Sequence, residues 1–438
     1  MFSSSTSKAQ CKPSLVIVGN GMATGRLLDE IITRSPKRYT ITVIGEEAQG
    51  SYNRILLSTV LAKETHYENI IQKTPQWYQD NDITFISSTR VTDIDRSTKT
   101  LTTETYHNDN FSDISRAQLQ YDELVLAVGS RAATIPAKNQ NIEGIFSFRN
   151  IRDTQNIQSF SKNHKNAVVI GGGLLGLEAA YGLASTGVTV TLIHRNKWLL
   201  NRQLDLVAGD MLKKVMAEKN ITFVLGEEVV RFDQLMNANN KASLSGIELT
   251  SGEYRKADIA IIATGITPNS ELGDCCGLEV DKAIVVNDYM QTSDKHISAL
   301  GECCQHKKST FGLVDPIWKQ CESLAIRLTS LHLQKFKNAP VATKLKVSGV
   351  QLFSAGIVES SEKTQTFTLC DNNARVYRKL IIENNIIVGI VLFGDVSSGM
   401  DYFELMQNKT PVKMHMPELL LGAEYMLDEK IETENKVA

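Results

Sequence analysis

Cysteines at the C-x-x-C spacing are missing from this chain of 438 residues. No two of its seven cysteines are spaced as C-x-x-C; they are Cys11, Cys275, Cys276, Cys303, Cys304, Cys321 and Cys370. The absence of this spacing excludes a zinc site, a thioredoxin-like dithiol and most iron–sulfur ligand sets, so we expect no metal. The adjacent pairs 275–276 and 303–304 could be redox couples, but we interpret them as small buried thiols.

Long apolar runs and charge of one sign are also missing. No stretch approaches the roughly 18–20 apolar residues that span a bilayer. Residues 1–14 are polar and lack the apolar core of a signal peptide, so we expect a cytoplasmic location and no membrane partner. The net charge of −2 and the lack of an extended basic run argue against nucleic acid. Because 42% of the residues are apolar and 22% charged, we expect a folded chain rather than a disordered one. A length of 438 residues is too great for one core, so we expect two or three domains.

Two glycine-rich turns, about 150 residues apart, are the most informative feature present. The first is Gly19-Asn20-Gly21-Met22-Ala23-Thr24-Gly25, after the apolar run 15–18. The second is Gly171-Gly172-Gly173-Leu174-Leu175-Gly176, after the run 168–170. Each predicts a buried strand, a tight turn and a helix start, which together set a pyrophosphate on backbone N–H groups. Two such turns indicate two dinucleotides, usually a flavin and a nicotinamide.

The first unit continues with a helix and a second strand at 39–44, followed by Glu46 and Glu47. An acid at the end of this strand can accept hydrogen bonds from ribose hydroxyls; the alternative is a solvated pair of loop glutamates. Thr24 occupies the place of the third glycine, so we expect a slightly bulkier contact between helix and strand there.

A β-rich segment follows, with strand candidates at 83–86, 90–94, 98–104 and 124–128 and a polar hairpin at 107–115. The last strand ends in the small residues Ala127, Val128 and Gly129, where a backbone can approach a cofactor closely. The pattern recurs at 259–265, ending at Gly265. The chain is therefore expected to contain two related nucleotide-binding units.

The second unit, from about 152 to 270, has a predicted helix at 175–184 and a strand at 188–193. His194 and Arg195 stand where an acid would bind ribose. Positive charge favours a 2′-phosphate, which indicates NADPH or dual NAD(P)H use. The alternative is a surface arginine beside an adenine edge that tolerates NADH.

After 271 the chain is expected to return to the first domain, with a strand at 284–287, a strand and turn at 296–302 and a helix at 316–333. Pro340 marks a linker to a small domain, and the tail from Glu424 to Glu434 is expected to be frayed or helical. The predicted fold is α/β, with two Rossmann-like dinucleotide-binding domains, for FAD and NAD(P), and a small C-terminal α+β domain. Its boundaries are 14–150 and 271–338 (FAD), 151–270 (NAD(P)), 339–411 (C-terminal) and 412–438 (tail).

Together these residues resemble the pyridine-nucleotide:disulfide reductase superfamily over about residues 14–410. Four motifs narrow the resemblance: 19–22, 52–58 (YNRILLS), Arg202-Gln203-Leu204-Asp205 and Gly301-Glu302-Cys303. So does the late stretch from Tyr377-Arg378-Lys379-Leu380 to Gly394-Asp395-Val396. They are similar to the flavin-containing part of assimilatory NAD(P)H-nitrite reductase large subunits and to the standalone electron-transfer subunits of assimilatory nitrate reductases.

Two departures from these families limit the chemistry. The chain has no cysteine sets for the iron–sulfur and sirohaem domains of nitrite reductases, so we expect that it does not reduce nitrite by itself. The disulfide reductases carry a C-x-x-x-x-C pair after the second strand, where this chain has Ser51-Tyr52-Asn53-Arg54 and Ser58. We therefore expect electrons to leave directly from the flavin.

The resemblance implies a role for each candidate site residue. For FAD, Gly19 and Gly21-Met22-Ala23 would hold the pyrophosphate, Glu46 the ribose and Val91 the adenine edge, with close backbone contacts at Ala127, Val128 and Gly129. Arg54 would reach the pyrophosphate or the polar edge of the flavin, with a salt bridge to a neighbouring acid as the alternative. Gly301 and Glu302 would contact the ribitol.

The NAD(P)H site implied by the resemblance uses Gly171, Gly173, Leu175, Gly176, His194, Arg195 and Gly265. Glu178 would face the contact between nicotinamide and flavin as the catalytic candidate; it would also, or instead, be a first-turn acid that favours the helix dipole.

The function implied is an NAD(P)H-oxidising FAD flavoprotein that passes electrons to a partner with an iron–sulfur or molybdenum centre. The partner expected first is the catalytic subunit of assimilatory nitrate reductase. The alternatives are a rubredoxin or ferredoxin reductase, a partner of nitrite reductase, and a flavin redox sensor without turnover.

Overall fold

The computed structural model describes residues 12–108, 112–236, 240–330, 332–347, 349–412 and 417–422. Cys11 and the predicted tail at 424–434 lie outside them. The chain divides into two compact units. Unit 1 contains the chain up to Leu56, His66–Arg131 and Ile266–Ala339; unit 2 contains Leu57–Thr65, Ala132–Gly265 and the chain from Pro340.

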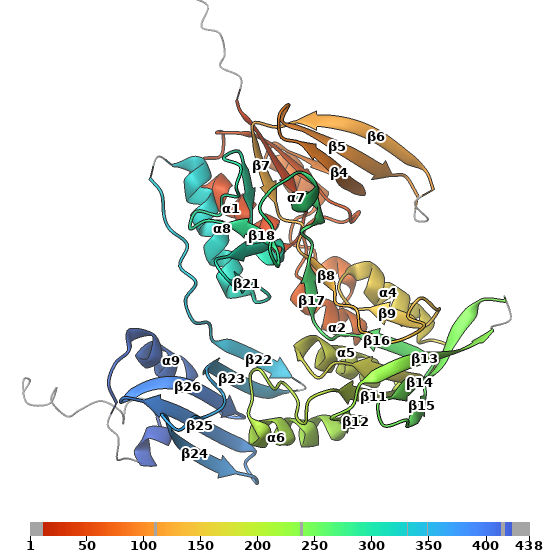
Figure 1. Ribbon diagram of the computed structural model, residues 1–438, viewed down its shortest axis with the longest axis vertical. Helices are drawn as coiled ribbons and strands as arrows, with labels where there is room; N and C mark the ends of the chain where they lie inside the picture. Colours follow the sequence, from red (N-terminus) through yellow and green to blue (C-terminus); the bar gives the residue numbers. More distant parts are fainter. Residues whose placement is uncertain are drawn as a thin grey trace, which may run out of the picture. The chain divides into compact units, whose positions relative to one another are not determined.

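Unit 1, in which Figure 1 labels β7, α1 and α8, is built on a five-stranded parallel sheet. The strand order is β19-β7-β1-β2-β3. The strands are β1 (Ser14–Val18), β2 (Thr40–Ile44), β3 (Ile83–Ile86), β7 (Glu123–Leu126) and β19 (Ile297–Ala299). They read as near-continuous Val, Ile and Leu runs because a parallel sheet is covered on both faces. Two long helices, α1 (Met22–Arg34) and α8 (Val314–Thr329), pack against each other in this unit.

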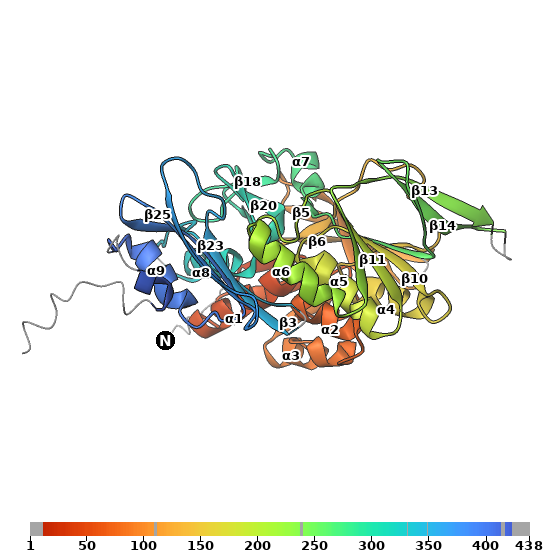
Figure 2. The ribbon, with the colours of Figure 1, turned by 90° about the horizontal axis from the view of Figure 1, so that it is seen from below.

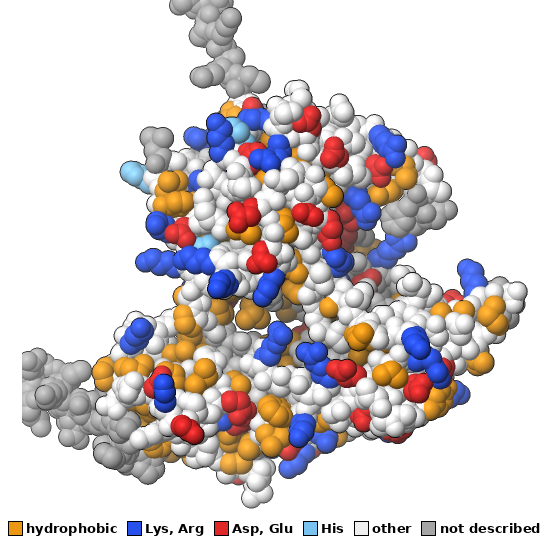
Figure 3. All heavy atoms as spheres, viewed as in Figure 1, with side chains coloured by type: hydrophobic (Ala, Val, Ile, Leu, Met, Phe, Trp, Pro, Cys, Tyr) orange, Lys and Arg blue, Asp and Glu red, His pale blue; other side chains and the backbone are white. Residues whose placement is uncertain are grey.

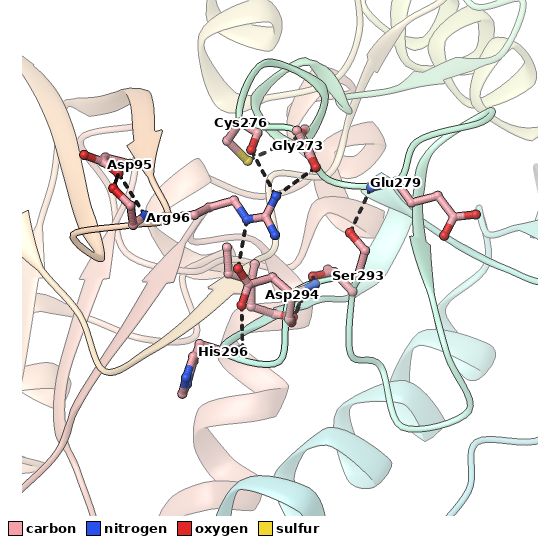
Figure 4. Close-up of polar contacts among 12 residues, drawn as sticks. Asp95, Arg96, Gly273, Cys276, Glu279, Ser293, Asp294 and His296 are labelled. Atoms are coloured by element: carbon pink, nitrogen blue, oxygen red, sulfur yellow. Dashed lines mark hydrogen bonds and ion pairs between the residues drawn. The ribbon is translucent and has the colours of Figure 1, made fainter.

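An antiparallel sheet extends unit 1, formed by β4 (Thr89–Asp95), β5 (Thr100–Tyr106) and β6 (Ile114–Gln120). Arg96, in the turn between β4 and β5, joins this sheet to the returning segment 271–294 (Figure 4). Its Nε donates to Asp294 Oδ2 at 2.8 Å and its Nη1 donates to the Gly277 carbonyl at 2.9 Å. The remaining elements of unit 1 are short: η1 (Arg54–Leu56), η2 (Tyr67–Ile70), α3 (Pro75–Asp80), α7 (Glu271–Cys275), β17 (Ile266–Pro268), β18 (Ile284–Val286), η3 (Gly301–Cys303), β20 (Cys304–His306) and β21 (Ser309–Thr310).

Unit 2 repeats the parallel sheet, in the order β12-β11-β10-β16-β9. Its strands are β9 (Ile145–Ser147), β10 (Asn166–Ile170), β11 (Thr189–His194), β12 (Ile221–Leu225) and β16 (Ile259–Ile262). Strand β9 takes the place that β19 has in unit 1. Figure 2 shows α5 (Leu174–Ser185) and α6 (Leu206–Ala217) beside this sheet. Also in unit 2 are α2 (Leu57–Leu61), β8 (Ser130–Ala132, which straddles the boundary), α4 (Ile151–Phe160) and an antiparallel sheet of β13 (Val229–Met236), β14 (Ala242–Leu249) and β15 (Tyr254–Lys256).

The C-terminal part of unit 2 has its own antiparallel sheet, in the order β22-β23-β26-β25-β24. The elements are β22 (Thr343–Val347), β23 (Val350–Gly356), β24 (Gln365–Asp371), β25 (Val376–Glu383), β26 (Ile386–Phe393), α9 (Gly399–Asn408) and η4 (Pro417–Leu420). Val412, Leu419 and Leu420 are buried in its core. This core therefore continues past residue 411, where the sequence prediction ended the domain.

The predicted α/β class with two Rossmann-like units and a small C-terminal α+β part is confirmed. Four details differ. The 114–120 segment is a strand that the prediction missed, because its residues are polar and mostly exposed. Helix α8 begins at Val314 and ends at Thr329, where Ser330 turns extended, not at 333. Strand β5 begins at Thr100, after the left-handed Lys99. Strand β9 pairs with β16, so the second sheet begins before residue 151.

Candidate functional site

The first glycine turn is pressed against the end of the neighbouring strand. Gly19 has a left-handed φ of 99°, and a Cβ there would lie 2.2 Å from the Ala127 carbonyl oxygen. Only glycine fits such a position. Gly129, also left-handed, has open space where a Cβ would stand. The predicted residues after β1 and β7 are thus brought together, with room beside them for a ligand.

Helix α1 begins at this turn without a side-chain cap. Gly21 is its N-cap residue, Met22 and Ala23 open its first turn, and no acidic side chain lies there. Uncapped N–H groups at a helix start favour an anion. The residues therefore fit a pyrophosphate, and their role in holding one stays a prediction.

A layer of side chains holds this turn from behind, and the contacts that Ser51 and Tyr78 make in it were not foreseen. Thr24 Oγ1 donates to the Gly19 carbonyl at 2.7 Å, and Ser51 Oγ donates to the Gly21 carbonyl at 3.0 Å. Tyr78 OH donates to Asn20 Oδ1 at 2.8 Å, while Asn20 Nδ2 is buried with no partner among the described residues. Ser51 and Tyr78 are far away in sequence, so no local pattern could have revealed them.

The Gly301-Glu302 turn lies beside the first glycine turn; its contact with the ribitol stays a prediction. A Cβ on Gly301 would stand 3.5 Å from Ala23 Cβ. Glu302 Oε2 accepts from Ser130 Oγ at 2.6 Å, next to Gly129. Gln320 Oε1 accepts from Gly301 N–H at 2.8 Å; this fully buried side chain was not foreseen and fixes the turn.

Arg54 forms an ion pair with Glu47 and also adjoins the first turn. Its Nε lies 4.0 Å from the position of a Gly21 Cβ, and its guanidinium stands 4.9 Å from the Tyr52 ring centroid. Burial lowers the pKa of Arg54, but the carboxylates of Glu47 and Glu302 outweigh burial and raise it. The alternative interpretation, a salt bridge with a neighbouring acid, is therefore observed. The Arg54 guanidinium nevertheless still faces the first glycine turn.

The residues predicted to contact the adenosine end of FAD in unit 1 lie at a surface ion pair. Glu46 accepts from Arg90 Nε at 3.0 Å, and both side chains are more than half exposed. Val91, the next residue, is 8% exposed and belongs to the core of the unit. Glu46 and Val91 thus lie close in space, because Arg90, the residue before Val91, pairs with Glu46. Their roles in binding FAD stay predictions.

The second glycine turn repeats the geometry of the first. Gly171 has a φ of 124°, and its Cβ would lie 2.3 Å from the Ala263 carbonyl oxygen. A Cβ on Gly176 would lie 1.9 Å from the Gly171 carbonyl oxygen. Gly173 is the uncapped N-cap residue of α5, followed by the half-buried Leu175, and Gly265 is left-handed with open space around it.

His194 and Arg195 separate in the structure. The buried His194 ring lies under the turn, where Nδ1 accepts from Gly172 N–H at 3.0 Å and Nε2 approaches Asn201 Oδ1 at 3.3 Å. Burial lowers the pKa of His194, which keeps the ring neutral. Arg195 is exposed and makes no ion pair with any described residue. Of the two, Arg195 is the side chain free to meet a phosphate.

Glu178 lies in the second turn of α5, and no acidic side chain lies in the first turn. The alternative interpretation of Glu178 as a first-turn acid is therefore wrong, because the helix begins at Leu174. Burial raises the pKa of Glu178 from 4.5 to about 7. Its carboxyl therefore changes charge near neutral pH, a property that clusters at functional sites.

The cysteines differ in their exposure to solvent. Cys303, Cys304 and Cys321 are buried, and burial raises the pKa of the Cys303 thiol to about 11. Cys275 is exposed, so the expectation that both adjacent pairs are buried was wrong for it, because it ends the short surface helix α7. Within the described residues, no three His, Cys, Asp or Glu side chains gather closely enough to hold a metal ion.

The surface carries no large field of one charge on the face drawn in Figure 3, where basic and acidic side chains are interspersed. No helix in the described part of the chain combines the length and apolar character needed to cross a membrane.

Comparison with known proteins agrees with this geometry. Residues 13–343 match the family model "Pyridine nucleotide-disulphide oxidoreductase", and residues 340–410 match "Rubredoxin NAD+ reductase C-terminal domain". The chain is 38% identical to nitrite reductase [NAD(P)H] of Bacillus subtilis over 404 residues, which is 92% of this chain and 48% of the relative. It is 33% identical to the assimilatory nitrate reductase electron transfer subunit of Bacillus subtilis, over 88% of this chain and 48% of the relative.

A solved complex of putidaredoxin reductase with putidaredoxin shares the fold, with a TM-score of 0.79 and 22% identity, covering 98% of this chain and 100% of that chain. Other solved proteins of the same fold hold NADH or NADPH. The chain spans about half the length of the curated relatives it matches. Since the family model covers residues 13–343, which include both glycine turns, the chain belongs to the pyridine nucleotide-disulphide oxidoreductase family, whose cofactors are FAD and NAD(P)H.

Proposed function

We propose that this chain oxidises NAD(P)H through FAD and passes the electrons to a separate redox protein, first of all the catalytic subunit of an assimilatory nitrate reductase. One observation carries the proposal. Each parallel sheet ends in a glycine turn pressed against the carbonyl at the end of a neighbouring strand, Gly19 on Ala127 and Gly171 on Ala263. One chain thus has two places for a dinucleotide.

The assignment of the two sites follows from their surroundings. In unit 1, Gly19, Gly21, Ala23, Ala127–Gly129 and Gly301-Glu302 would hold FAD, with Arg54 as a cation beside the pyrophosphate. In unit 2, Gly171, Gly173 and Gly176 would hold the nicotinamide nucleotide. When bound, the flavin accepts a hydride and can release electrons one at a time. The chain supplies orientation and exclusion of water.

The choice of acceptor rests on relatedness and on sequence. The electron transfer subunit of an assimilatory nitrate reductase is among the relatives. The segment that carries the cysteine pair in disulfide reductases has Ser51 and Ser58 here, which disfavours a dithiol relay. A rubredoxin-type acceptor is the second candidate, because residues 340–410 match the C-terminal domain of rubredoxin reductases.

Steady-state kinetics test the proposal. The purified protein, supplied with FAD, should be yellow, should oxidise NADPH with ferricyanide as acceptor, and should reduce the nitrate reductase catalytic subunit faster than rubredoxin. Faster reduction of rubredoxin would support the second candidate instead. Protein that stays colourless with excess FAD contradicts the assignment, and FAD binding without turnover would indicate a sensor.

A matched pair of variants tests the FAD site itself. Arg54→Met should lower the ratio of bound FAD to protein, because it removes a cation beside Gly21. Arg116→Met is the control, since Arg116 is a 75% exposed cation on β6 that pairs with Glu104. Equal FAD content in both variants would remove Arg54 from the site.

A further inference from the structure

Two sequence motifs that no cofactor role explains meet in unit 2. Asp205 ends the Arg202–Asp205 motif, and Tyr377 and Lys379 belong to the 377–380 motif on β25. Tyr377 OH donates to Asp205 Oδ2 at 2.7 Å, and Lys379 Nζ donates to the same oxygen at 2.9 Å. The C-terminal domain is thus joined to the nicotinamide half of unit 2 by a charged cluster.

This cluster is buried and hydrogen-bonded. The Lys379 and Asp205 side chains are each 8% exposed, and Tyr377 is 3% exposed. Lys379 Nζ also donates to the Val358 carbonyl at 2.9 Å. A buried carboxylate that loses one of its donors is strongly destabilised, so both members of such a pair hold each other in place.

The alternation of β25 explains the rest of the second motif. Arg378, between the two residues, points to the other face of the strand, where it donates to Asp395 Oδ2 at 2.5 Å and to the Leu420 carbonyl at 2.6 Å. Arg378 therefore bonds within the C-terminal domain, while Tyr377 and Lys379 both reach Asp205 outside it.

Asp205 is at the same time part of the nicotinamide site's framework. Its Oδ1 caps helix α6 by accepting from Ala208 N–H at 3.1 Å. The loop before it, residues 195–204, begins at Arg195 and returns to the second glycine turn, where Leu200 N–H donates to the Gly172 carbonyl at 2.9 Å. Within the loop, Trp198 Nε1 donates to the Leu204 carbonyl at 2.9 Å.

We propose that Tyr377 and Lys379 are positioning residues for the nicotinamide nucleotide. They hold Asp205, and through it the 195–204 loop, in the shape that receives the adenosine end of the ligand beside Arg195. The C-terminal domain thereby sets the affinity of a site to which it contributes no ligand contact. This inference rests on the proposed NAD(P)H site of unit 2.

The test is the affinity for ADP-ribose, the part common to NADH and NADPH, measured by isothermal titration calorimetry on the FAD-loaded protein. Lys379→Met should weaken binding by about fivefold to tenfold, as expected for coupling between neighbouring elements. Arg375→Met is the matched control, because Arg375 pairs with Glu218 on the same helix–domain boundary, both half exposed. It should bind ADP-ribose as the wild type does.

Two further variants keep the test decisive if Lys379→Met folds poorly. Tyr377→Phe removes one hydroxyl and should weaken binding by about twofold to threefold. Asp205→Asn/Lys379→Met keeps the helix cap and removes the unpaired buried charge, so it should bind more tightly than Lys379→Met alone.

Kinetics separate positioning from general damage. In Lys379→Met the KM for NAD(P)H should rise while kcat at saturation stays near that of the wild type. Unchanged ADP-ribose affinity in Lys379→Met and Tyr377→Phe, with only a lower unfolding temperature, would overturn the inference. Wild-type protein that fails to bind ADP-ribose would instead overturn the proposed NAD(P)H site.

Discussion

The Thr24 hydroxyl donates a 2.7 Å hydrogen bond to the carbonyl oxygen of Gly19, five residues before it. In unit 2 the residue five places after the corresponding Gly171 is Gly176, whose missing Cβ lets the Gly171 carbonyl approach to 1.9 Å from where that Cβ would be. The carbonyl at this position of the turn accepts a hydrogen bond from a hydroxyl in unit 1, whereas in unit 2 it packs against the backbone of a glycine. The bulkier contact expected at Thr24 is a hydrogen bond.

Thr24→Val should loosen the first turn, because it puts a methyl group where the hydroxyl donates and leaves the Gly19 carbonyl without that donor. We expect a loss of about 1–2 kcal/mol in the free energy of unfolding and a lower FAD content. Urea denaturation and the ratio of flavin to protein absorbance measure both. Thr24→Ser, which keeps the hydroxyl, should stay near the wild type; equal behaviour of the two variants would contradict the role of the hydrogen bond.

Gly176→Ala should damage the second turn selectively. The new Cβ meets a backbone oxygen of Gly171, which is itself held against Ala263 and has no room to move. We expect affinity for NADP⁺ to fall more than about tenfold, with FAD content unchanged because unit 1 is untouched. In Gly173→Ala the added methyl group meets nothing within 4 Å, so its unfolding temperature should match the wild type. A stable, tightly binding Gly176→Ala protein would disprove the packing argument.

The sequence was sufficient to predict the glycine turns and most parallel strands, because a strand buried on both faces is a continuous apolar run and a left-handed turn needs glycine. The prediction missed β9 and β12 of the second sheet. It was insufficient for Ser51, Tyr78 and Gln320, whose role depends on tertiary contacts across 19 to 58 positions. The polar strand β6 was missed for a related reason: its mostly exposed side chains show no apolar alternation. The meeting of Asp205 with Lys379 was equally invisible, since 174 positions separate them.

Arg195→Ala tests nucleotide choice. Arg195 is exposed at the end of β11, while His194 beside it is engaged with Gly172. If Arg195 meets the 2′-phosphate, its removal should lower kcat/KM for NADPH by about tenfold and leave NADH within about twofold. Lys197→Ala, a neighbouring exposed cation on the same loop, is the control for a general charge effect. Absence of NADPH preference in wild type and variant alike would assign Arg195 to the solvated surface.

Glu178 makes the stability of unit 2 depend on pH. Burial raises its folded-state pKa to about 7 from 4.5, so between these values the folded chain keeps a proton that the unfolded chain has lost. The free energy of unfolding therefore falls as pH rises through this window, by on the order of 3 kcal/mol, and levels off above about pH 7. Glu178→Gln, which cannot ionise, should lose this slope and be more stable than the wild type at pH 8, measured by urea denaturation without nucleotide. Glu64→Gln is the control. Glu64 is an exposed carboxylate that accepts a hydrogen bond from Tyr181, which lies on α5 as Glu178 does. Parallel stability curves for wild type and Glu178→Gln from pH 5 to 8 would show that the carboxyl is ionised throughout that range.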